Sequence, residues 1–148
     1  PDAVLVTGWS YGGYLTLQSL GTRPDLWAGG MAGIAIADWT VMYEDQAETL
    51  RGYQRALFGG TPQEKPDAHR ASSPITYAEQ IKAPILVVQG SNDTRCPARQ
   101  MRGYEERLKA LGKLIHIHWF DAGHGSRAQE QSIEHQELLL RFAYQVLG

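Results

Sequence analysis

The chain has 148 residues, of which 43% are hydrophobic and 20% charged, and its formal net charge is −2. This composition suits one globular domain and excludes a disordered or fibrous chain. Acids and bases are intermixed and the longest apolar stretch is short, so we expect neither nucleic acid nor a membrane among the partners.

Apolar, strand-like runs alternate with helix-like runs from the start of the chain. Residues 3–7 (AVLVT) predict a buried strand. Residues 11–20 then place leucines at roughly helical spacing, and a glycine and a proline follow as stop signals. Residues 27–37 predict a second strand, whose small side chains suit a crowded central position with helices on both faces.

The middle of the chain has a weaker pattern. Spacing of i, i+3 and i+4 between Trp39, Met42 and Tyr43 predicts that a helix begins after Asp38. Residues 59–73 contain two prolines and two adjacent glycines and are predicted to be a loop.

The second half of the chain repeats the alternation more clearly. We predict a short helix over residues 74–81, a strand over 84–90, a helix over 97–111, a strand over 114–120 and a long helix over 126–147. Strands that alternate with helices pair in parallel through right-handed crossovers. The predicted fold is therefore α/β, with a parallel sheet of about four strands flanked by helices.

The segment Gly8-Trp9-Ser10-Tyr11-Gly12 lies between the first strand and the first helix and fits G-x-S-x-G, the nucleophile elbow. The sharp turn points a serine hydroxyl outward, and we expect a Cβ at either flanking glycine to clash with the turn. The free N–H groups of the following helix would face an oxyanion. A tight turn with an incidental serine is the alternative, which five residues alone do not exclude.

A serine nucleophile needs a base and an acid that orients the base, and on this fold they follow it in the order acid, then histidine. Asp93 follows the strand over 84–90, and His124 follows the strand over 114–120. The carboxyl ends of parallel strands meet at one edge of a sheet, where ligands bind. The predicted catalytic residues are therefore Ser10, Asp93 and His124.

Each partner also has a simpler interpretation. Asp93 follows an asparagine and suits a turn. Asp121 is a rival carboxylate, but it lies three residues before His124, so we expect it to brace that loop. A histidine between two glycines is typical of an exposed, mobile imidazole, although a surface histidine of no function is the alternative.

Other histidines are less informative. His116 and His118 have the H-x-H spacing of metal ligands, but the sequence offers no third ligand, so we expect an exposed strand face and no metal site. His69 and His135 are predicted to lie at the surface.

Three further features leave alternatives open. Trp39, Met42 and Tyr43 are either core residues or an aromatic wall of a pocket for the acyl side of a substrate. Arg95 pairs either with substrate or with a nearby acid. Arg51, Arg55 and the acids over residues 44–48 are most simply a solvated helix face.

Two features concern the origin of the chain. Cys96 is the single cysteine, so an internal disulfide is impossible, which favours a cytoplasmic location. The chain begins with Pro1 and enters a strand within a few residues, without the pattern of a signal peptide. We expect a C-terminal piece of a longer protein, with a processed mature chain as the alternative.

Four segments together resemble the prolyl oligopeptidase family of serine peptidases: GWSYGGY, GGTPQEKP, SPITYAEQIKAPILVVQGSNDTRCP and WFDAGHG. The most similar branch is that of the acylaminoacyl-peptidases and dipeptidyl-aminopeptidases. The resemblance implies that residues 1–148 are the C-terminal portion of an α/β-hydrolase catalytic domain. It also implies a role for each matching residue: Ser10 as nucleophile, Asp93 as orienting acid, His124 as general base, the Tyr11 N–H as an oxyanion donor, and Ile36, Trp39 and Tyr43 as pocket lining.

Members of this family also carry an N-terminal β-propeller, which restricts access to short peptides, and the first half of the hydrolase domain, which supplies a tyrosine as second oxyanion donor. This sequence contains neither, so the first strand would expose an edge through which a homo-oligomer can form. The expected function is cleavage of short peptides by acyl transfer, without a metal or organic cofactor. An esterase, or a catalytically incomplete fragment that serves assembly, is the alternative.

Overall fold

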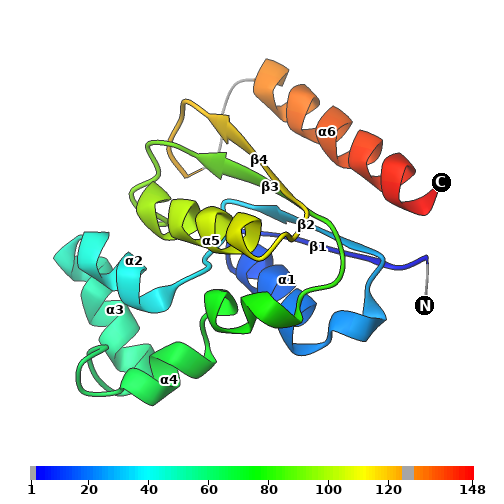
Figure 1. Cartoon of the computed structure of the whole chain (residues 1–148). Coiled ribbons are helices and arrows are strands. Elements are labelled where there is room, and N and C mark those ends of the chain that lie inside the picture. Colours follow the sequence, from blue (N-terminus) through cyan, green and yellow to red (C-terminus); the bar gives the residue numbers. More distant parts are fainter. Residues whose placement is uncertain (1–2, 125–128) are drawn as a thin grey trace.

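Four parallel strands form the centre of the molecule in a computed structural model, which describes residues 3–124 and 129–148 (Figure 1). The strands are β1 (Leu5–Trp9), β2 (Gly29–Gly33), β3 (Ile85–Gly90) and β4 (Ile115–Phe120), and they lie in chain order across the sheet. All three pairings are parallel, with Leu5 opposite Gly29 and Gly30 opposite Ile85. The predicted α/β architecture is confirmed.

Helices cover both faces of this sheet. One face carries α1 (Tyr11–Thr22), α5 (Ala98–Ala110) and the 3₁₀ segment η2 (Pro74–Gln80). Buried apolar side chains join them to the sheet, among them Leu17, Leu20, Ile81, Met101, Tyr104 and Leu108. The other face carries α6 (Gln129–Leu147), which contacts β2 and β3 (Figure 1). Neither α6 nor any other helix of the described residues is long and apolar enough to cross a membrane.

Small residues let the neighbouring elements approach β2 closely, and every residue of this strand is buried. A Cβ at Gly30 would lie 2.3 Å from Leu20 Cδ1 of α1, and one at Gly33 would lie 1.8 Å from the Trp9 ring. The prediction of a crowded central strand is therefore confirmed.

Several element boundaries differ from the predictions. The second strand ends at Gly33, because Ile34 turns the chain with a φ of 39°. The helix predicted after Asp38 is two helices, α2 (Trp39–Asp45) and α3 (Glu48–Phe58), separated by two residues with extended backbone. The predicted loop over 59–73 contains a short helix, α4 (Pro66–Ala71), and η1 (Pro24–Leu26) precedes β2.

Two histidines predicted to lie at the surface are buried, so that prediction was wrong. His69 is 0% exposed, because its Nδ1 hydrogen-bonds Lys65 O at 2.7 Å and its ring stacks on Phe58. His135 of α6 is 4% exposed among aromatic rings, with Phe120 at 4.7 Å. The same helix half-buries His118, which lies 3.5 Å from Glu134, whereas His116 is exposed as expected.

Among the described residues, β4 pairs with β3 alone and β1 with β2 alone, so each leaves one edge of the sheet without a partner strand. Around β1, whose outer edge is unpaired, large apolar side chains are 41–53% exposed: Val4 before the strand, Trp9 in it, and Tyr11 and Leu15 in α1. Among the residues that the structure describes, no further strand covers that edge.

Candidate active site

Ser10 is the single residue between β1 and α1, and its backbone is strained. Its φ is 58° and its ψ −115°, a conformation that costs a non-glycine residue about 1–3 kcal/mol. Two backbone bonds hold it: its N–H donates to Gly33 O at 2.8 Å, and its carbonyl accepts from Tyr14 N at 3.0 Å. The turn therefore presents the serine hydroxyl at the carboxyl end of the sheet.

Of the two glycines in the G-x-S-x-G motif, only the first is needed to avoid a steric clash in the turn. A Cβ at Gly8 would lie 2.1 Å from the carbonyl oxygen of Gly12, which leaves no room for a side chain. A Cβ at Gly12, in the first turn of α1, would meet nothing within 4 Å beyond its chain neighbours and the backbone of its own helix. The second crowded glycine is Gly13, where a Cβ would lie 2.6 Å from Gly33 O. The expectation that Gly12 avoids a clash was wrong.

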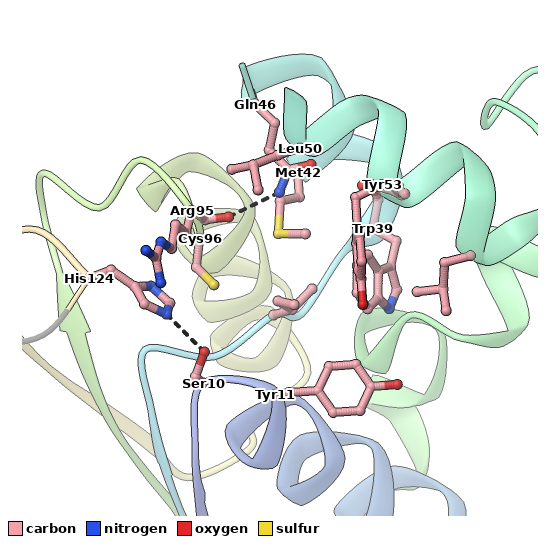
Figure 2. A pocket seen from close by; sticks show the side chains of 13 residues that line it. Ser10, Tyr11, Trp39, Met42, Gln46, Leu50, Tyr53, Arg95, Cys96 and His124 are labelled. Carbon is pink, nitrogen blue, oxygen red and sulfur yellow. Dashed lines mark hydrogen bonds between the residues drawn. The ribbon is translucent and has the colours of Figure 1, made fainter. Parts of the chain in front are cut away.

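Two hydrogen bonds join the three predicted catalytic side chains in the order Ser10, His124, Asp93. His124 Nε2 is 2.8 Å from Ser10 Oγ, and His124 Nδ1 is 2.7 Å from Asp93 Oδ2 (Figure 2). A carboxylate only accepts hydrogen bonds, so Nδ1 carries the proton and Nε2 is left to accept from the serine hydroxyl. This is the tautomer in which the imidazole acts as a base toward Ser10.

The Asp93 carboxylate is fixed from the opposite side by the backbone. Its Oδ1 accepts from the N–H groups of Arg95 and Cys96, both at 2.8 Å, and its side chain is 0% exposed. Asp121 instead accepts from Asn92 Nδ2 at 2.5 Å, so it braces the loop as expected. Gly125, the second glycine beside His124, lies outside the described residues.

An oxyanion position follows from the start of α1. Tyr11 is the first residue of this helix, and the first N–H groups of a helix have no acceptor within it. These groups, at the positive end of the helix, lie next to Ser10 and favour a developing negative charge there. The predicted donor, the Tyr11 N–H, belongs to the residue that directly follows the candidate nucleophile, Ser10.

A cavity of about 550 Å³ opens beside Ser10 and His124 (Figure 2). Ile36 and Trp39 line it, as the sequence suggested. The sequence did not predict the contribution of α3, which supplies Leu50, Tyr53 and Leu57. Their spacing of i, i+3 and i+7 was the available signal, because it places the three on one helix face.

Tyr43, also expected in this wall, is not among the residues that line the cavity. Its hydroxyl accepts from Arg55 at 2.8 Å and its carbonyl accepts from Arg51 at 2.8 Å, which turns it toward α3. The same two arginines bind Glu44 O and Glu48, so this polar face is a network of contacts and not only a solvated surface.

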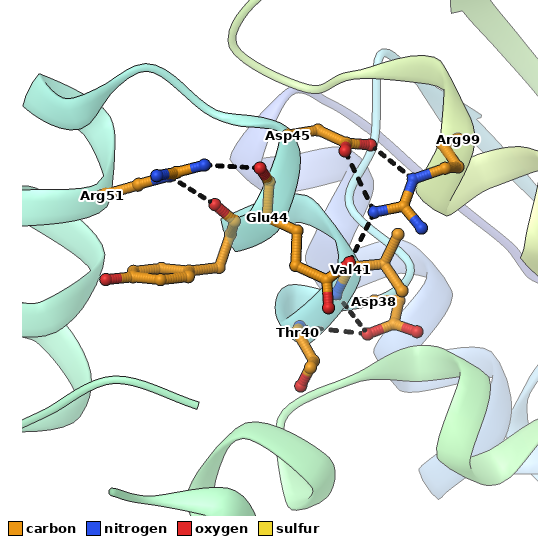
Figure 3. A network of polar contacts seen from close by, with 8 residues as sticks. Asp38, Thr40, Val41, Glu44, Asp45, Arg51 and Arg99 are labelled. Atoms are coloured by element: carbon orange, nitrogen blue, oxygen red, sulfur yellow. Dashed lines mark hydrogen bonds and ion pairs between the residues drawn. The ribbon is translucent and has the colours of Figure 1, made fainter. Parts of the chain in front are cut away.

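Polar contacts also fix α2 at both of its ends (Figure 3). At its start, the Asp38 carboxylate caps the helix by accepting from the N–H groups of Thr40 and Val41. At its end, Arg99 of α5 donates to the carboxylate of Asp45 at 2.8 Å. The second contact ties α2, one wall of the cavity, to α5, which packs against β4 of the sheet.

The loop after β3 contributes two more residues to the cavity, Arg95 and Cys96. Arg95 is exposed, and its carbonyl accepts from Gln46 Nε2 at 3.0 Å. Cys96 is 4% exposed, and burial together with the negative charge of Asp93 raises the pKa of its thiol to about 12. Nothing in the sequence pattern had indicated that this cysteine lies at the site.

Comparison with known proteins places this chain among peptidases. The sequence model of the prolyl oligopeptidase family matches residues 1–148. The chain is 28% identical to dipeptidyl aminopeptidase BIII of Pseudoxanthomonas mexicana over 99% of its length. It superimposes on the acylaminoacyl peptidase of Pyrococcus horikoshii with a TM-score of 0.87 at 29% identity, covering 99% of this chain. A puromycin-hydrolyzing peptidase of Mycobacterium tuberculosis gives a TM-score of 0.90 at 25% identity over the full chain.

These relatives are much longer than the chain. It spans 22% of the Pseudoxanthomonas enzyme, 24% of the Pyrococcus chain and 22% of the Mycobacterium chain.

Proposed function

This chain belongs to the prolyl oligopeptidase family, and from that premise we propose that it carries the catalytic triad of a serine peptidase acting on short peptides. The observation that supports this most directly is the pair of bonds that joins Ser10 to His124 and His124 to Asp93, at 2.8 and 2.7 Å. A nucleophile, a base in the required tautomer and a buried orienting acid are the parts that acyl transfer needs.

The proposed reaction proceeds through an acyl-enzyme. Ser10 Oγ attacks the carbonyl carbon of the scissile bond while His124 Nε2 takes the hydroxyl proton. Asp93 stabilises the imidazolium that forms, and the Tyr11 N–H stabilises the oxyanion. The leaving amine takes the proton from His124, and a water molecule activated by the same histidine then hydrolyses the acyl-enzyme.

We assign the cavity beside Ser10 to the residue on the acyl side of the cleaved bond. Its walls are mainly apolar and aromatic, and among the described residues no acidic side chain lines it. A volume of about 550 Å³ exceeds what a small side chain fills. We therefore propose a preference for large apolar residues over alanine or lysine at this position.

The open edge of β1 supports a further part of the proposal. The relatives are several times longer than this chain, and β1 leaves exposed apolar side chains beside an unpaired edge. We propose that the first half of a hydrolase domain pairs there and supplies the second oxyanion donor, and that a β-propeller limits access to short peptides. Pairing with a second copy is the alternative occupant.

The test compares the hydrolysis of peptide anilides with that of aryl esters, and it uses the full-length protein that the gene encodes. We expect hydrolysis of short peptide anilides with phenylalanine or leucine before the cut, and loss of that activity in Ser10→Ala. Activity on short aryl esters alone would favour an esterase. No activity on either, in wild type as in Ser10→Ala, would favour a fragment that serves assembly.

A further inference from the structure

The thiol of Cys96 has no part in the reaction proposed above, although it lies at the catalytic centre. Figure 2 shows the Cys96 side chain pointing into the cavity next to His124. Its backbone N–H holds Asp93 Oδ1 at 2.8 Å, so acid and cysteine are fixed relative to each other. The thiol therefore lies beside a carboxylate and an imidazole.

Together the three side chains offer the ligand types that zinc prefers. One ligand atom each from Asp93, Cys96 and His124 lies within 4.8 Å of the other two. Zinc is tetrahedral and binds thiolate sulfur at about 2.3 Å and imidazole nitrogen at about 2.1 Å, so two such ligand atoms lie about 3.6 Å apart on one ion. Small side-chain movements would therefore bring all three onto one ion.

We propose that Cys96, His124 and Asp93 form an inhibitory site for a thiophilic divalent cation, for which Zn²⁺ is the simplest probe. The charges balance: the cation meets one carboxylate and one thiolate. The thiol releases its proton to water as the metal–sulfur bond forms, and the ion loses water molecules from its own shell. No group is oxidised or reduced.

The carboxylate retains capacity for the ion. An ionised carboxylate offers about four lone-pair sites, and those of Asp93 accept from Arg95 N, Cys96 N and His124 Nδ1. One site is left for a cation. The cavity that opens beside Ser10 is the route by which the ion reaches it.

Cation binding and catalysis exclude each other, because both nitrogens of His124 are already used. An ion at Nε2 removes the base from Ser10. An ion at Nδ1 replaces the bond to Asp93, and the Nδ1 proton moves to Nε2, which then cannot accept from the serine hydroxyl. Either arrangement prevents attack by Ser10. The inhibition should therefore also protect Ser10 from active-site-directed reagents.

The first experiment measures the Zn²⁺ concentration that halves activity, with each variant normalised to its own rate in the presence of a chelator. We expect Cys96→Ser to raise that concentration more than about tenfold. Loss of a residue that only hydrogen-bonds a metal ligand already weakens metal affinity by about tenfold, and loss of a ligand should weaken it more. His116→Gln, on the exposed part of β4, is the matched control and should leave it unchanged. Equal Zn²⁺ sensitivity of wild type and Cys96→Ser, or loss of inhibition in His116→Gln, would overturn the proposal.

The second experiment needs no turnover, so its failure is distinct from failure of the proposed peptidase function. Cd²⁺ is titrated into the Ser10→Ala protein and the ultraviolet cadmium–thiolate charge-transfer band is recorded. We expect the band in Ser10→Ala and its absence from Ser10→Ala/Cys96→Ala. If Cys96→Ser does not fold, Cys96→Ala replaces it in the first experiment. Mg²⁺, which prefers oxygen ligands, should not compete with Cd²⁺. A protein without the band at saturating Cd²⁺ would refute the site.

Discussion

Asp93 acts on Ser10 only through the imidazole of His124, so its effect depends on which nitrogen carries the proton. In Asp93→Asn, the amide group can donate to Nδ1, which forces the proton onto Nε2. The imidazole then cannot accept from the serine hydroxyl, and we expect kcat for a peptide anilide to fall by about 10⁴.

Asp121→Asn is the matched control for that substitution. Asp121 bonds Asn92 and lies on the same loop as His124, but the base takes its orienting bond from Asp93. We expect kcat to change little. A loss as large as that of Asp93→Asn would mean that Asp121 is the orienting acid.

The glycines of the elbow predict opposite effects on stability. Gly8→Ala places a Cβ 2.1 Å from a backbone oxygen, and such overpacking costs about 1–3 kcal/mol or more. Gly12→Ala meets open space in a helix, where alanine gains up to about 1 kcal/mol over glycine. Chemical denaturation of the two variants measures this, and equal destabilisation would contradict the geometry described for the turn.

At the scale of elements, α6 depends on a buried histidine. Burial lowers the pKa of His135, His118 lowers it further, and Glu134 opposes them. An unfolded histidine titrates near about pH 6.5. Below that pH the unfolded chain binds a proton that folded His135 resists, so the stability of this helix falls as the pH falls toward the folded pKa.

Hydrogen exchange of the α6 amides, corrected for intrinsic rates, tests this between about pH 7 and about pH 5. We expect protection to decrease over this interval, and to decrease less in His135→Leu. His116→Gln is the control on the exposed strand face and should behave as wild type. An unchanged pH dependence in His135→Leu would show that another group is responsible.

The elements also show what sequence reasoning can reach. Strand and helix alternation could be predicted because apolar runs and stop signals are local. Ser10, Asp93 and His124 could be predicted from the G-x-S-x-G motif, the expected order of acid and histidine, and the ends of the predicted strands. The break between α2 and α3, the arginines that turn Tyr43 from the cavity, and the burial of His69 and His135 depend on side-chain contacts, most of them between different elements. Local periodicity carries no record of such contacts.

For the whole molecule, we expect the open edge of β1 to determine whether the chain associates. An unpaired parallel edge with exposed apolar side chains invites pairing with another strand. We expect residues 1–148 produced alone to self-associate with rising concentration in sedimentation experiments, and the protein as encoded to do so less. A 148-residue chain that stays monomeric over the whole concentration range would contradict this prediction.

The central claim is that Ser10 is a nucleophile activated by His124 and Asp93, and covalent labelling tests it most directly. The encoded protein is treated with a fluorophosphonate probe, digested, and the modified residue is located by mass spectrometry. We predict one adduct on Ser10 in wild type, a strongly slowed reaction in His124→Ala and no adduct in Ser10→Ala. Equal labelling of wild type and Ser10→Ala, or no labelling of either, would contradict the account.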